Sequence, residues 1–567
     1  MNKNRKLTSL SRLLFNYSPK QLVFAVVLGM LSGALYSLII PFILSGLEDD
    51  SLTVSDYVLL EDGGAGFFIF VTAILLTKVA SVIFVNNIAK SASADLKLSV
   101  AKRIQALGVD TVERIGFSKI LNIVVDDVNK ITNAAVAIPM MIVSLVTVLG
   151  MLTYLAYLDL QVFAFICVAI VIGVLLFQLP VLFAKGLYTR SRNDKDALQE
   201  GIRGLIFGAY EMKLSHEKGK QFLAEEIAMP LASSTSQEKR GDAIIHLAGN
   251  ASEMICFFVI GAVVFLLPTG YLSSGTSAFG VVMALLYITG PIASILSMMQ
   301  TLKIAQVSLE RVHQLQLLEP EVYSTSKNTV ENTEWTKLSL SEVQYQYTSD
   351  EVDEAFALKP VSLNFEKGKI YFIVGGNGSG KSTLSKLISF HYRPTKGCVQ
   401  FDDTVVTENN LMQMREKVGV IFSNYHLFKK LYIPTEKIDR EKVQQYMETF
   451  KLTGKTELVG NIFTTTKLSD GQRRRLALLV ALMEDKDIYI FDEWAADQDP
   501  EFKDFFYTQV LPELKAQGKL VVAITHDDRY FNCADSVIKM ESGAVKSMMN
   551  TAAISLAKPA MPSMAQA

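Results

Sequence analysis

The sequence predicts a chain of two parts, an α-helical polytopic membrane domain with six transmembrane helices followed by an α/β domain with a largely parallel sheet. Two observations support this fold class. Half of the 567 residues are apolar and only 20% are charged, whereas soluble globular proteins carry about 25% charged residues. Long apolar stretches occur only before residue 305, and strand-like and helix-like runs alternate from residue 336 to about 548.

Charge and cysteine content exclude other classes of protein. The 55 Lys and Arg residues nearly balance the 57 Asp and Glu residues, which gives a formal net charge of −2. This balance argues against nucleic acid as a partner, because nucleic-acid binders carry a basic excess. The four cysteines are far apart and form no CxxC pair, so they indicate neither a zinc site nor a disulfide framework.

Each long apolar stretch can cross a membrane, because an α-helix needs about 20 residues, rising about 1.5 Å each, to span the hydrocarbon layer. The six predicted spans are residues 21–44, 66–88, 133–157, 160–184, 244–267 and 278–302. The first span follows a basic segment that lacks a small-residue cleavage site. We therefore interpret it as a retained membrane helix and not as a signal peptide.

Positive charge is confined to alternate connections. The N-terminal segment and the loops 89–131 and 185–241 are rich in Lys and Arg, whereas the connections 45–65, 158–159 and 268–277 contain neither. The positive-inside rule therefore places both termini and both long loops in the cytoplasm. The long loops carry apolar residues at helical spacing. We interpret them as helices that leave the bilayer and contact a cytoplasmic partner, with solvated connectors as the alternative.

Lys78 and Glu253 are ionisable residues within predicted spans. Such residues are costly at membrane depth and commonly face a cavity or a partner. Counting residues from the inner boundary places both at a depth of roughly 15 Å. They could pair with each other or line one water-filled cavity. The alternative is that either side chain only extends to the membrane surface or lies where its helix has already left the bilayer.

The second half of the chain begins after a polar segment without periodicity. Residues 318–335 are therefore predicted to link a membrane domain over residues 1–317 to an α/β domain over residues 336–549. Residues 550–567 have little charge and are rich in Ala and Pro, so they are predicted to be a disordered tail.

A glycine-rich loop between a predicted strand and a predicted helix matches the pattern GxxxxGKS. In this pattern the backbone N–H groups surround phosphate oxygens, Lys381 reaches the β- and γ-phosphates, and the Ser382 hydroxyl faces Mg²⁺. The candidate nucleotide-binding residues are Gly375, Gly376, Asn377, Gly378, Ser379, Gly380, Lys381, Ser382 and Thr383. A chance glycine-rich turn is the alternative, and the strand–loop–helix context argues against it.

The run DIYIFDE predicts a buried strand that ends in two carboxylates. Asp492 is placed to hold Mg²⁺, and Glu493 is the candidate general base for the attacking water. The next predicted strand ends at His526, which we interpret as a contact to the γ-phosphate. The alternatives are a helix cap for the acidic pair and a structural role for the histidine.

The segment LSDGQ, residues 468–472, opens a predicted helix. The N-terminus of this helix can bind a phosphate, with Ser469, Gly471 and Gln472 close to it. The arginines 473–475 that follow are interpreted as a solvated face of the helix.

LSDGQ between a P-loop and FDE resembles the signature of ABC-transporter ATPases. Six spans followed by one such domain resemble a half-size ABC exporter over essentially the whole chain. In that family two nucleotide domains enclose two ATP molecules, each between one P-loop and the partner's signature loop, so the resemblance implies a homodimer. It also implies that Tyr347 stacks on adenine and that residues 496–499 cross the dimer interface.

Longer strings are similar to the ABC exporters of syringomycin, pyoverdine precursors and lasso peptides. These strings are FDEWAADQDPEFKDFFYTQVLPELKAQGK, GAYEMKL and LLYITGPI. Trp494 stands where most ABC exporters carry proline. Another departure is in VGVIFSNYHLF, where Ser423 stands at the position of the usual Gln that contacts Mg²⁺. Ser423, Asn424 or water could take over that contact.

The resemblance implies ATP-driven export of a peptide-like secondary metabolite across the bacterial inner membrane, with ATP and Mg²⁺ as cofactors. The implied partners are a second copy of the chain, membrane lipid and the peptide-like substrate. One alternative is a flippase for a lipid or a lipid-linked precursor. The other is a membrane ATPase that regulates a partner without moving a solute.

Overall fold

The computed structural model describes residues 18–47, 63–262, 265, 275–318, 320–321, 335–347 and 356–551. Two units are formed, one from residues 1–101 with 121–317 and the other from residues 102–120 with 318–567. The segment Lys102–Ile120 therefore groups with the second unit, although the sequence places it inside the first long loop of the helical half.

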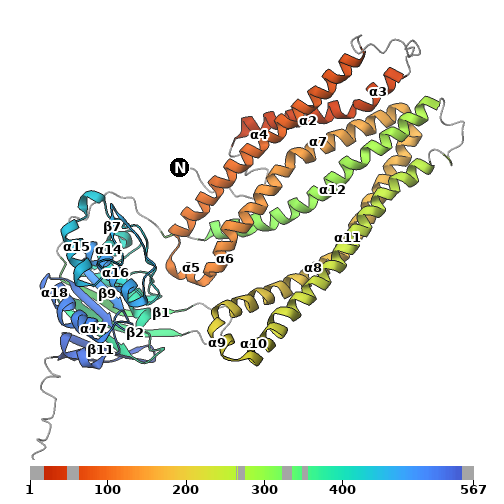
Figure 1. The fold of residues 1–567 in the computed structure, drawn as a ribbon. Helices are drawn as coiled ribbons and strands as arrows, with labels where there is room; N and C mark the ends of the chain where they lie inside the picture. The colour runs from red at the N-terminus through yellow and green to blue at the C-terminus, as the bar shows by residue number, and fades with distance from the viewer. Residues whose placement is uncertain are drawn as a thin grey trace, which may run out of the picture. The chain divides into compact units, whose positions relative to one another are not determined.

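The first unit is entirely helical where it is described (Figure 1). Its helices are α2 (Pro19–Ser37), α3 (Ile39–Leu47), α4 (Gly63–Ala106), α7 (Val128–Leu158), α8 (Leu160–Phe207), α9 (Ala209–Leu214), α10 (His216–Phe222), α11 (Met229–Gly261) and α12 (Gly275–Leu317). Short π-helical turns, Ile123–Asp127 and Leu223–Ala228, precede α7 and α11.

Five helical stretches among the described residues are long and apolar enough to cross a membrane. They are Pro19–Ile43, Gly66–Ala106, Lys119–Leu158, Leu160–Phe207 and Phe279–Leu317. These stretches correspond to five of the six predicted spans. The remaining predicted span, residues 244–267, begins within α11 and continues into residues that are mostly outside the described part.

Several of these helices are far longer than a membrane requires. Helix α4 has 44 residues and α8 has 48, which corresponds to lengths of roughly 66 and 72 Å. The hydrocarbon layer is only about 30 Å thick. The prediction that the long loops continue the membrane helices is confirmed for the segments that α4 and α8 contain.

Small residues allow close packing within the helical unit, where α7 packs against both α2 and α12, and α8 packs along α11. A Cβ atom added to Gly33 on α2 would lie 2.7 Å from the backbone oxygen of Val143 on α7. One turn further along α7, the Thr147 hydroxyl donates a hydrogen bond to the backbone oxygen of Gly33, at 3.3 Å. Small residues at such interfaces let helix backbones approach closely in a membrane.

The substitution Gly33→Leu is expected to disrupt the packing of α2 on α7. The added side chain would overlap the Val143 backbone, and overpacking of this kind costs about 1–3 kcal/mol. We expect a lower apparent Tm and a lower monodisperse yield in detergent size-exclusion chromatography. Gly186→Leu is the control, because a Cβ at Gly186 meets no atom of the described residues within 4 Å. Equal yields for the two variants would contradict this account of the interface.

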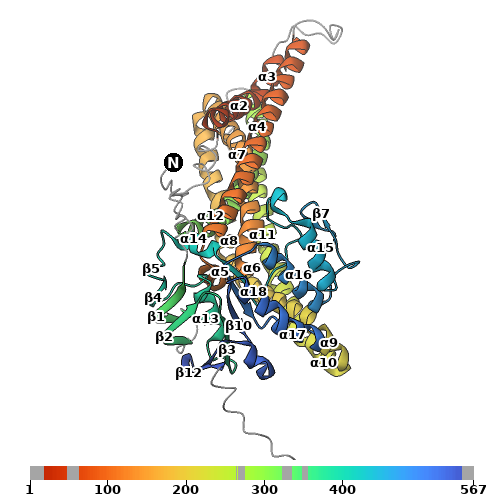
Figure 2. The same ribbon diagram turned by 90° about the vertical axis from the view of Figure 1, so that its left-hand side faces the viewer.

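The second unit contains the predicted α/β domain, with two main sheets (Figure 2). One sheet has the order β12-β11-β3-β10-β9-β6, in which all neighbouring pairs except β11–β12 are parallel. The strands of this sheet are β3 (Ile370–Gly375), β6 (Val418–Ile421), β9 (Ile488–Asp492), β10 (Leu520–Ile524), β11 (Ser536–Glu541) and β12 (Ala544–Asn550). This mainly parallel sheet and the helical unit confirm the predicted fold class.

The other main sheet is antiparallel, with the order β2-β1-β4-β5. Its strands are β1 (Lys337–Gln346), β2 (Ala357–Glu366), β4 (Lys396–Phe401) and β5 (Thr404–Val405), and a separate hairpin pairs β7 (Leu458–Val459) with β8 (Ile462–Phe463). The helices of this unit are α5 (Val109–Ile115), α13 (Lys381–Ile388), α14 (Leu411–Glu416), α15 (Arg440–Thr449), α16 (Asp470–Met483), α17 (Pro500–Phe505) and α18 (Leu511–Ala516), while α6 (Phe117–Asn122) crosses the boundary between the units.

The central strands of the parallel sheet are buried on both faces. All five residues of β9 and all five of β10 are buried, which is typical of parallel strands covered by helices. Strand β10 lies between β3 and β9. The carboxyl ends of β3, β10 and β9 therefore meet at one edge of the sheet, where ligands bind in open α/β sheets.

Candidate functional site

The loop between β3 and α13 has the backbone of a phosphate-binding loop. Gly378 and Gly380 have φ angles of +74° and +98°, a region that glycine enters without a steric cost. The Lys381 ammonium donates hydrogen bonds to the backbone oxygens of Gly375 and Gly376, at 2.9 and 3.1 Å. The loop thus curls around the lysine that the sequence assigned to the phosphates.

One buried hydroxyl in this loop supports the fit of a phosphate group. Ser379 is 4% exposed, and its Oγ atom has no hydrogen-bond partner among the described residues. A buried polar atom without a partner is costly, and a phosphate oxygen would accept its hydrogen bond. The residues of this loop therefore fit the phosphate groups of a nucleoside triphosphate.

The predicted carboxylates lie at the end of β9. Asp492 is 3% exposed, and burial, followed by the charge of Glu493, raises the pKa of its carboxyl group. Burial removes water from the Asp492 carboxylate. A bound cation would stabilise its ionised form, because a nearby positive charge favours the ionised form. The backbone of Ser423 lies near Asp492 and acts in the opposite direction, lowering the pKa of this carboxyl group.

The structure brings the two predicted catalytic residues together. Nε2 of His526 lies 3.1 Å from Oε1 of Glu493, and both side chains remain partly exposed. His526 follows β10 and Glu493 follows β9, so the contact results from the parallel pairing of these strands. The roles of Glu493 as base and of His526 as γ-phosphate contact stay predictions.

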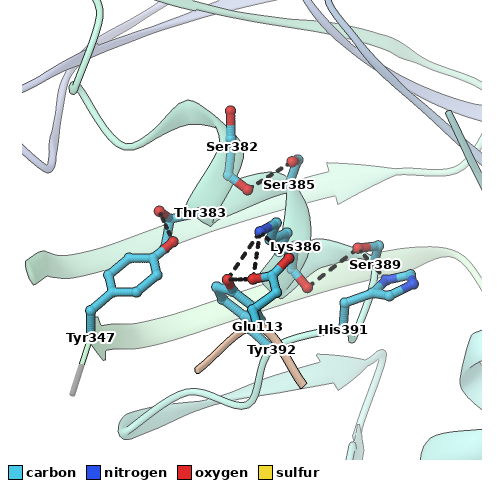
Figure 3. A network of polar contacts seen from close by, with 9 residues as sticks. All are labelled: Glu113, Tyr347, Ser382, Thr383, Ser385, Lys386, Ser389, His391 and Tyr392. Atoms are coloured by element: carbon cyan, nitrogen blue, oxygen red, sulfur yellow. Dashed lines mark hydrogen bonds and ion pairs between the residues drawn. The ribbon is translucent and has the colours of Figure 1, made fainter. Parts of the chain in front are cut away.

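Tyr347, the predicted adenine-stacking residue, lies beside the end of the phosphate-binding loop. Its hydroxyl is 3.1 Å from Oγ1 of Thr383 (Figure 3). The ring is partly exposed and contacts Tyr345 edge to face, with 5.1 Å between the ring centroids. This position next to Thr383 places Tyr347 beside the phosphate-binding loop, and stacking on adenine stays a prediction.

The LSDGQ segment forms the start of α16, as its pattern predicted. Ser469 is the N-cap residue, and it exchanges hydrogen bonds with Gln472 in a capping box. This arrangement satisfies donors of the first helical turn. The backbone oxygen of Gly471 accepts a hydrogen bond from Nε2 of Gln498, at 3.1 Å.

The interpretation of arginines 473–475 as a solvated face is wrong for two of the three. Arg475 is 9% exposed, and its guanidinium stacks on the Phe502 ring, 4.1 Å from the ring centroid. The side chain of Arg474 is only 12% exposed. The helix turns these two residues toward the segment 493–502, where carboxylates and backbone oxygens neutralise their charges. Charge alone could not reveal this, because the partners come from a later segment.

A polar network that the sequence did not indicate lies against α13 (Figure 3). Both carboxylate oxygens of Glu113, on α5, lie 3.0 Å from the ammonium of Lys386. The Tyr392 hydroxyl also donates to Glu113, at 2.5 Å, and the Tyr392 ring stacks on Tyr345. No local motif marks these residues, because Glu113 and Lys386 are 273 positions apart.

Of the two charged residues predicted at membrane depth, Lys78 is the one whose side chain the structure describes. Nζ of Lys78 lies 5.4 Å from the centroid of the Tyr36 ring, a cation–π contact. Tyr36 in turn contacts Tyr287, with 5.2 Å between ring centroids. The side chain of Glu253 is outside the described residues, so pairing with Lys78 stays a prediction.

The helical unit encloses a mainly apolar cavity between α8, α11 and α12, with a volume of about 370 Å³. Its polar lining residues are His246, Asn250, Thr289 and Ser297. This volume lies at the lower end of the range for small-molecule pockets, about 300–1,000 Å³. The cavity is therefore large enough for a side chain or a short acyl segment.

Comparison with known proteins agrees with this site. Residues 358–496 match the family model described as ABC transporter. The chain is 29% identical to the ATP-binding protein SyrD of Pseudomonas syringae pv. syringae, over 95% of this chain and 96% of that protein. It is 31% identical to the energy-coupling factor transporter ATP-binding protein EcfA1 of Mesomycoplasma hyopneumoniae (strain 7448), over 37% of this chain and 79% of that protein.

The whole fold also has a solved counterpart. The structure of a bacterial Atm1-family ABC exporter with ATP bound superposes with a TM-score of 0.73 at 16% identity, over 95% of this chain and 96% of that chain. The fold and the site together define a multi-pass membrane transporter that binds and hydrolyses ATP. The chain belongs to the ABC transporter family, and its fold is similar to that of the ABC exporter structure over nearly its whole length.

The substitution His391→Gln is expected to change the pH dependence of stability. Burial, followed by the positive charge of Arg415, lowers the pKa of His391 from 6.5 to about 4. In the folded protein His391 therefore binds a proton less readily than in the unfolded chain. Its contribution to the free energy of unfolding is complete above pH 6.5 and is lost as the pH falls to about 4. This loss amounts to about 3 kcal/mol at most.

The measurement is the apparent Tm of both proteins at pH 7, 5.5 and 4.5. Other titrating groups are the same in the two proteins, so the difference between the curves isolates His391. The Tm of His391→Gln should fall less than that of the wild type over this interval. Parallel curves would show that His391 is readily protonated in the folded protein.

Proposed function

We propose that the chain exports a peptide-like secondary metabolite, such as a cyclic peptide, a lipopeptide or a siderophore precursor, across the bacterial cytoplasmic membrane. The similarity to SyrD carries this proposal, because it extends over the membrane half as well as the ATPase. EcfA1, in contrast, covers only 37% of the chain. The strings around Trp494, GAYEMKL and LLYITGPI support the same branch.

In this proposal ATP binds along the loop from Gly375 to Thr383, with adenine on Tyr347. The side chains that would hold Mg²⁺ are those of Ser382 and Asp492, with Ser423 nearby through its backbone contact to Asp492. Bound Mg²⁺ would neutralise charge on the β- and γ-phosphates. Glu493 accepts the proton of the attacking water, and His526 holds the γ-phosphate in place.

We further infer that the working unit is a homodimer with both termini in the cytoplasm. One LSDGQ segment per chain can serve only one of two shared ATP sites. Tyr210 and Leu214 on the short helix α9, one helical turn apart, are 86% and 87% exposed, and we infer that the second copy covers them in the dimer.

The network around Glu113 supports coupling between ATP and transport. Helix α5 belongs to the first long loop of the helical half, and Lys386 lies on the helix that the phosphate-binding loop starts. The ion pair between them is partly buried, with side-chain exposures of 29% and 20%. A movement of α13 on ATP binding would therefore pull α5, and through it the long helix α4.

Glu493→Gln should retain ATP binding but lose turnover by at least about 100-fold, because a general base contributes that much to the rate. Lys381→Ala should instead lose ATP binding, since the positive charge near the phosphates is removed. ATP binding and phosphate release are measured on both purified variants. Near wild-type hydrolysis by Glu493→Gln would contradict the assignment of the base.

The cargo is tested in proteoliposomes with the same two variants. Accumulation of a cyclic lipopeptide, dependent on ATP and absent with Glu493→Gln, is the expected result. Movement of a fluorescent phospholipid without peptide transport would favour the flippase. Wild-type ATPase that responds to neither probe, together with a stable complex with another protein, would favour a regulatory ATPase.

Glu113→Gln should separate ATP hydrolysis from its stimulation by cargo. The variant keeps every phosphate contact but loses the charge that holds Lys386, so basal ATPase should persist while stimulation by the lipopeptide is lost. Glu408→Gln is the matched control, because Glu408 pairs with Arg393 on an exposed surface. Equal stimulation in both variants would exclude Glu113 from the coupling.

A further inference from the structure

We propose that Arg474 and Trp494 form a clamp that fixes the backbone of Glu493 and connects it to the LSDGQ helix. Arg474 is then a positioning residue for ATP hydrolysis and not a surface charge. The clamp rests on the proposed role of Glu493 as the general base.

The backbone of Glu493 needs support, because its conformation is uncommon. Its φ angle is +51°, in the left-handed region that residues other than glycine seldom occupy. Such conformations persist only where surrounding contacts fix them. The Glu493 N–H donates to the backbone oxygen of Ile524, at 3.1 Å, which fixes one side of the residue to β10.

Arg474 fixes the other side. Its Nη1 atom donates to the backbone oxygens of Glu493 and Trp494, at 2.6 and 3.1 Å. Its Nη2 atom lies 2.5 Å from the Asp497 carboxylate. A planar guanidinium can hold several acceptors at once in a fixed geometry. The direction in which the Glu493 carboxylate points is therefore tied to the position of Arg474.

Trp494 completes the clamp from the opposite direction. Its indole N–H donates to the backbone oxygen of Arg474, at 3.0 Å. The ring is 1% exposed and packs on Phe506, with 4.4 Å between centroids. Since the indole cannot move without opening the core, it anchors α16 at Arg474, just after the first turn of the helix. A proline at this position would have no side-chain donor for that hydrogen bond.

A second pair of contacts runs parallel to the clamp. Gln498 is 6% exposed, donates to the backbone oxygen of Gly471 and accepts a hydrogen bond from Nε of Arg475, at 2.9 Å. The first turn of α16 is thus joined at two places to the segment 493–498. In a dimer with shared ATP sites, LSDGQ faces the ATP bound by the partner subunit, whereas Glu493 faces the ATP bound by its own chain. The clamp therefore transmits the occupancy of one site to the base of the other.

The test compares Arg474→Ala with Arg473→Ala in the full-length protein. Both variants remove one positive charge from the same helical turn, but Arg473 contacts neither Glu493 nor Trp494 among the described hydrogen bonds and pairs with Asp470 instead. Arg474→Ala should lower kcat by about 10- to 100-fold, the effect of a misplaced catalytic group. Its KM for ATP should stay within about twofold of the wild type, because no phosphate contact is lost. Arg473→Ala should keep the wild-type kcat.

Three further variants separate positioning from general destabilisation. Trp494→Phe keeps a ring in the core but removes the N–H donor, so it should lower kcat with little change in Tm. Arg474→Lys keeps the charge without the planar fork, and it should recover only part of kcat. The double variant Glu493→Gln with Arg474→Ala should hydrolyse ATP no more slowly than Glu493→Gln alone, since the clamp acts through the base.

Two outcomes would overturn the clamp. Wild-type kcat in both Arg474→Ala and Trp494→Phe, with Glu493→Gln inactive, would reject the clamp and leave the proposed base in place. Additive losses in the double variant would assign Arg474 a role independent of Glu493. Normal hydrolysis by Glu493→Gln is a different result, because it would reject the proposed base and with it the reason for the clamp.

Discussion

The rest of this site depends on the parallel pairing of β10 with both β3 and β9. Because the three strands run in the same direction, their carboxyl ends lie at one edge of the sheet. That edge brings together the phosphate-binding loop, the Asp492–Glu493 pair and His526, which come from three separate parts of the sequence. Burial of β9 and β10 on both faces stabilises the register, and a slip by one residue would turn the acidic pair away from the loop.

Several residues at this edge have burial or backbone conformations that would destabilise the fold by themselves. Asp492 is a buried carboxylate, Ser379 has a buried hydroxyl without a partner in the described part of the chain, and Glu493 has a left-handed backbone. Such features gather at functional sites because a ligand or a rigid surrounding compensates them. Here the surrounding is the aromatic core behind Trp494, whose packing holds the strained segment in place.

Two polar contacts connect this edge of the sheet to other elements, and both involve partly buried charged side chains. Glu113 joins α5 to α13 through Lys386, and Arg474 joins the LSDGQ helix to the segment after β9. Partial burial strengthens such contacts relative to exposed ion pairs. Each contact also joins elements that must move together if ATP binding is to change the helical half of the molecule.

Local patterns in the sequence determined much of this protein. The apolar helices, the loop around Lys381 and the carboxylates ending β9 could be predicted, because apolar runs and glycine backbone freedom act over a few neighbouring residues. The resemblance to ABC exporters followed from the same short strings. The burial of Arg474 could not be predicted, since its charge favours the surface until a folded partner is present.

Only the tertiary structure decided which distant residues meet. The contact of Glu113 with Lys386 spans 273 positions, and no periodicity or local propensity encodes such a separation. The φ angle of Glu493 is likewise imposed by neighbours, because its own side chain disfavours that conformation. The sequence thus determined the chemical groups of the site, whereas long-range packing decided their orientation and their contacts with the segment around Glu113.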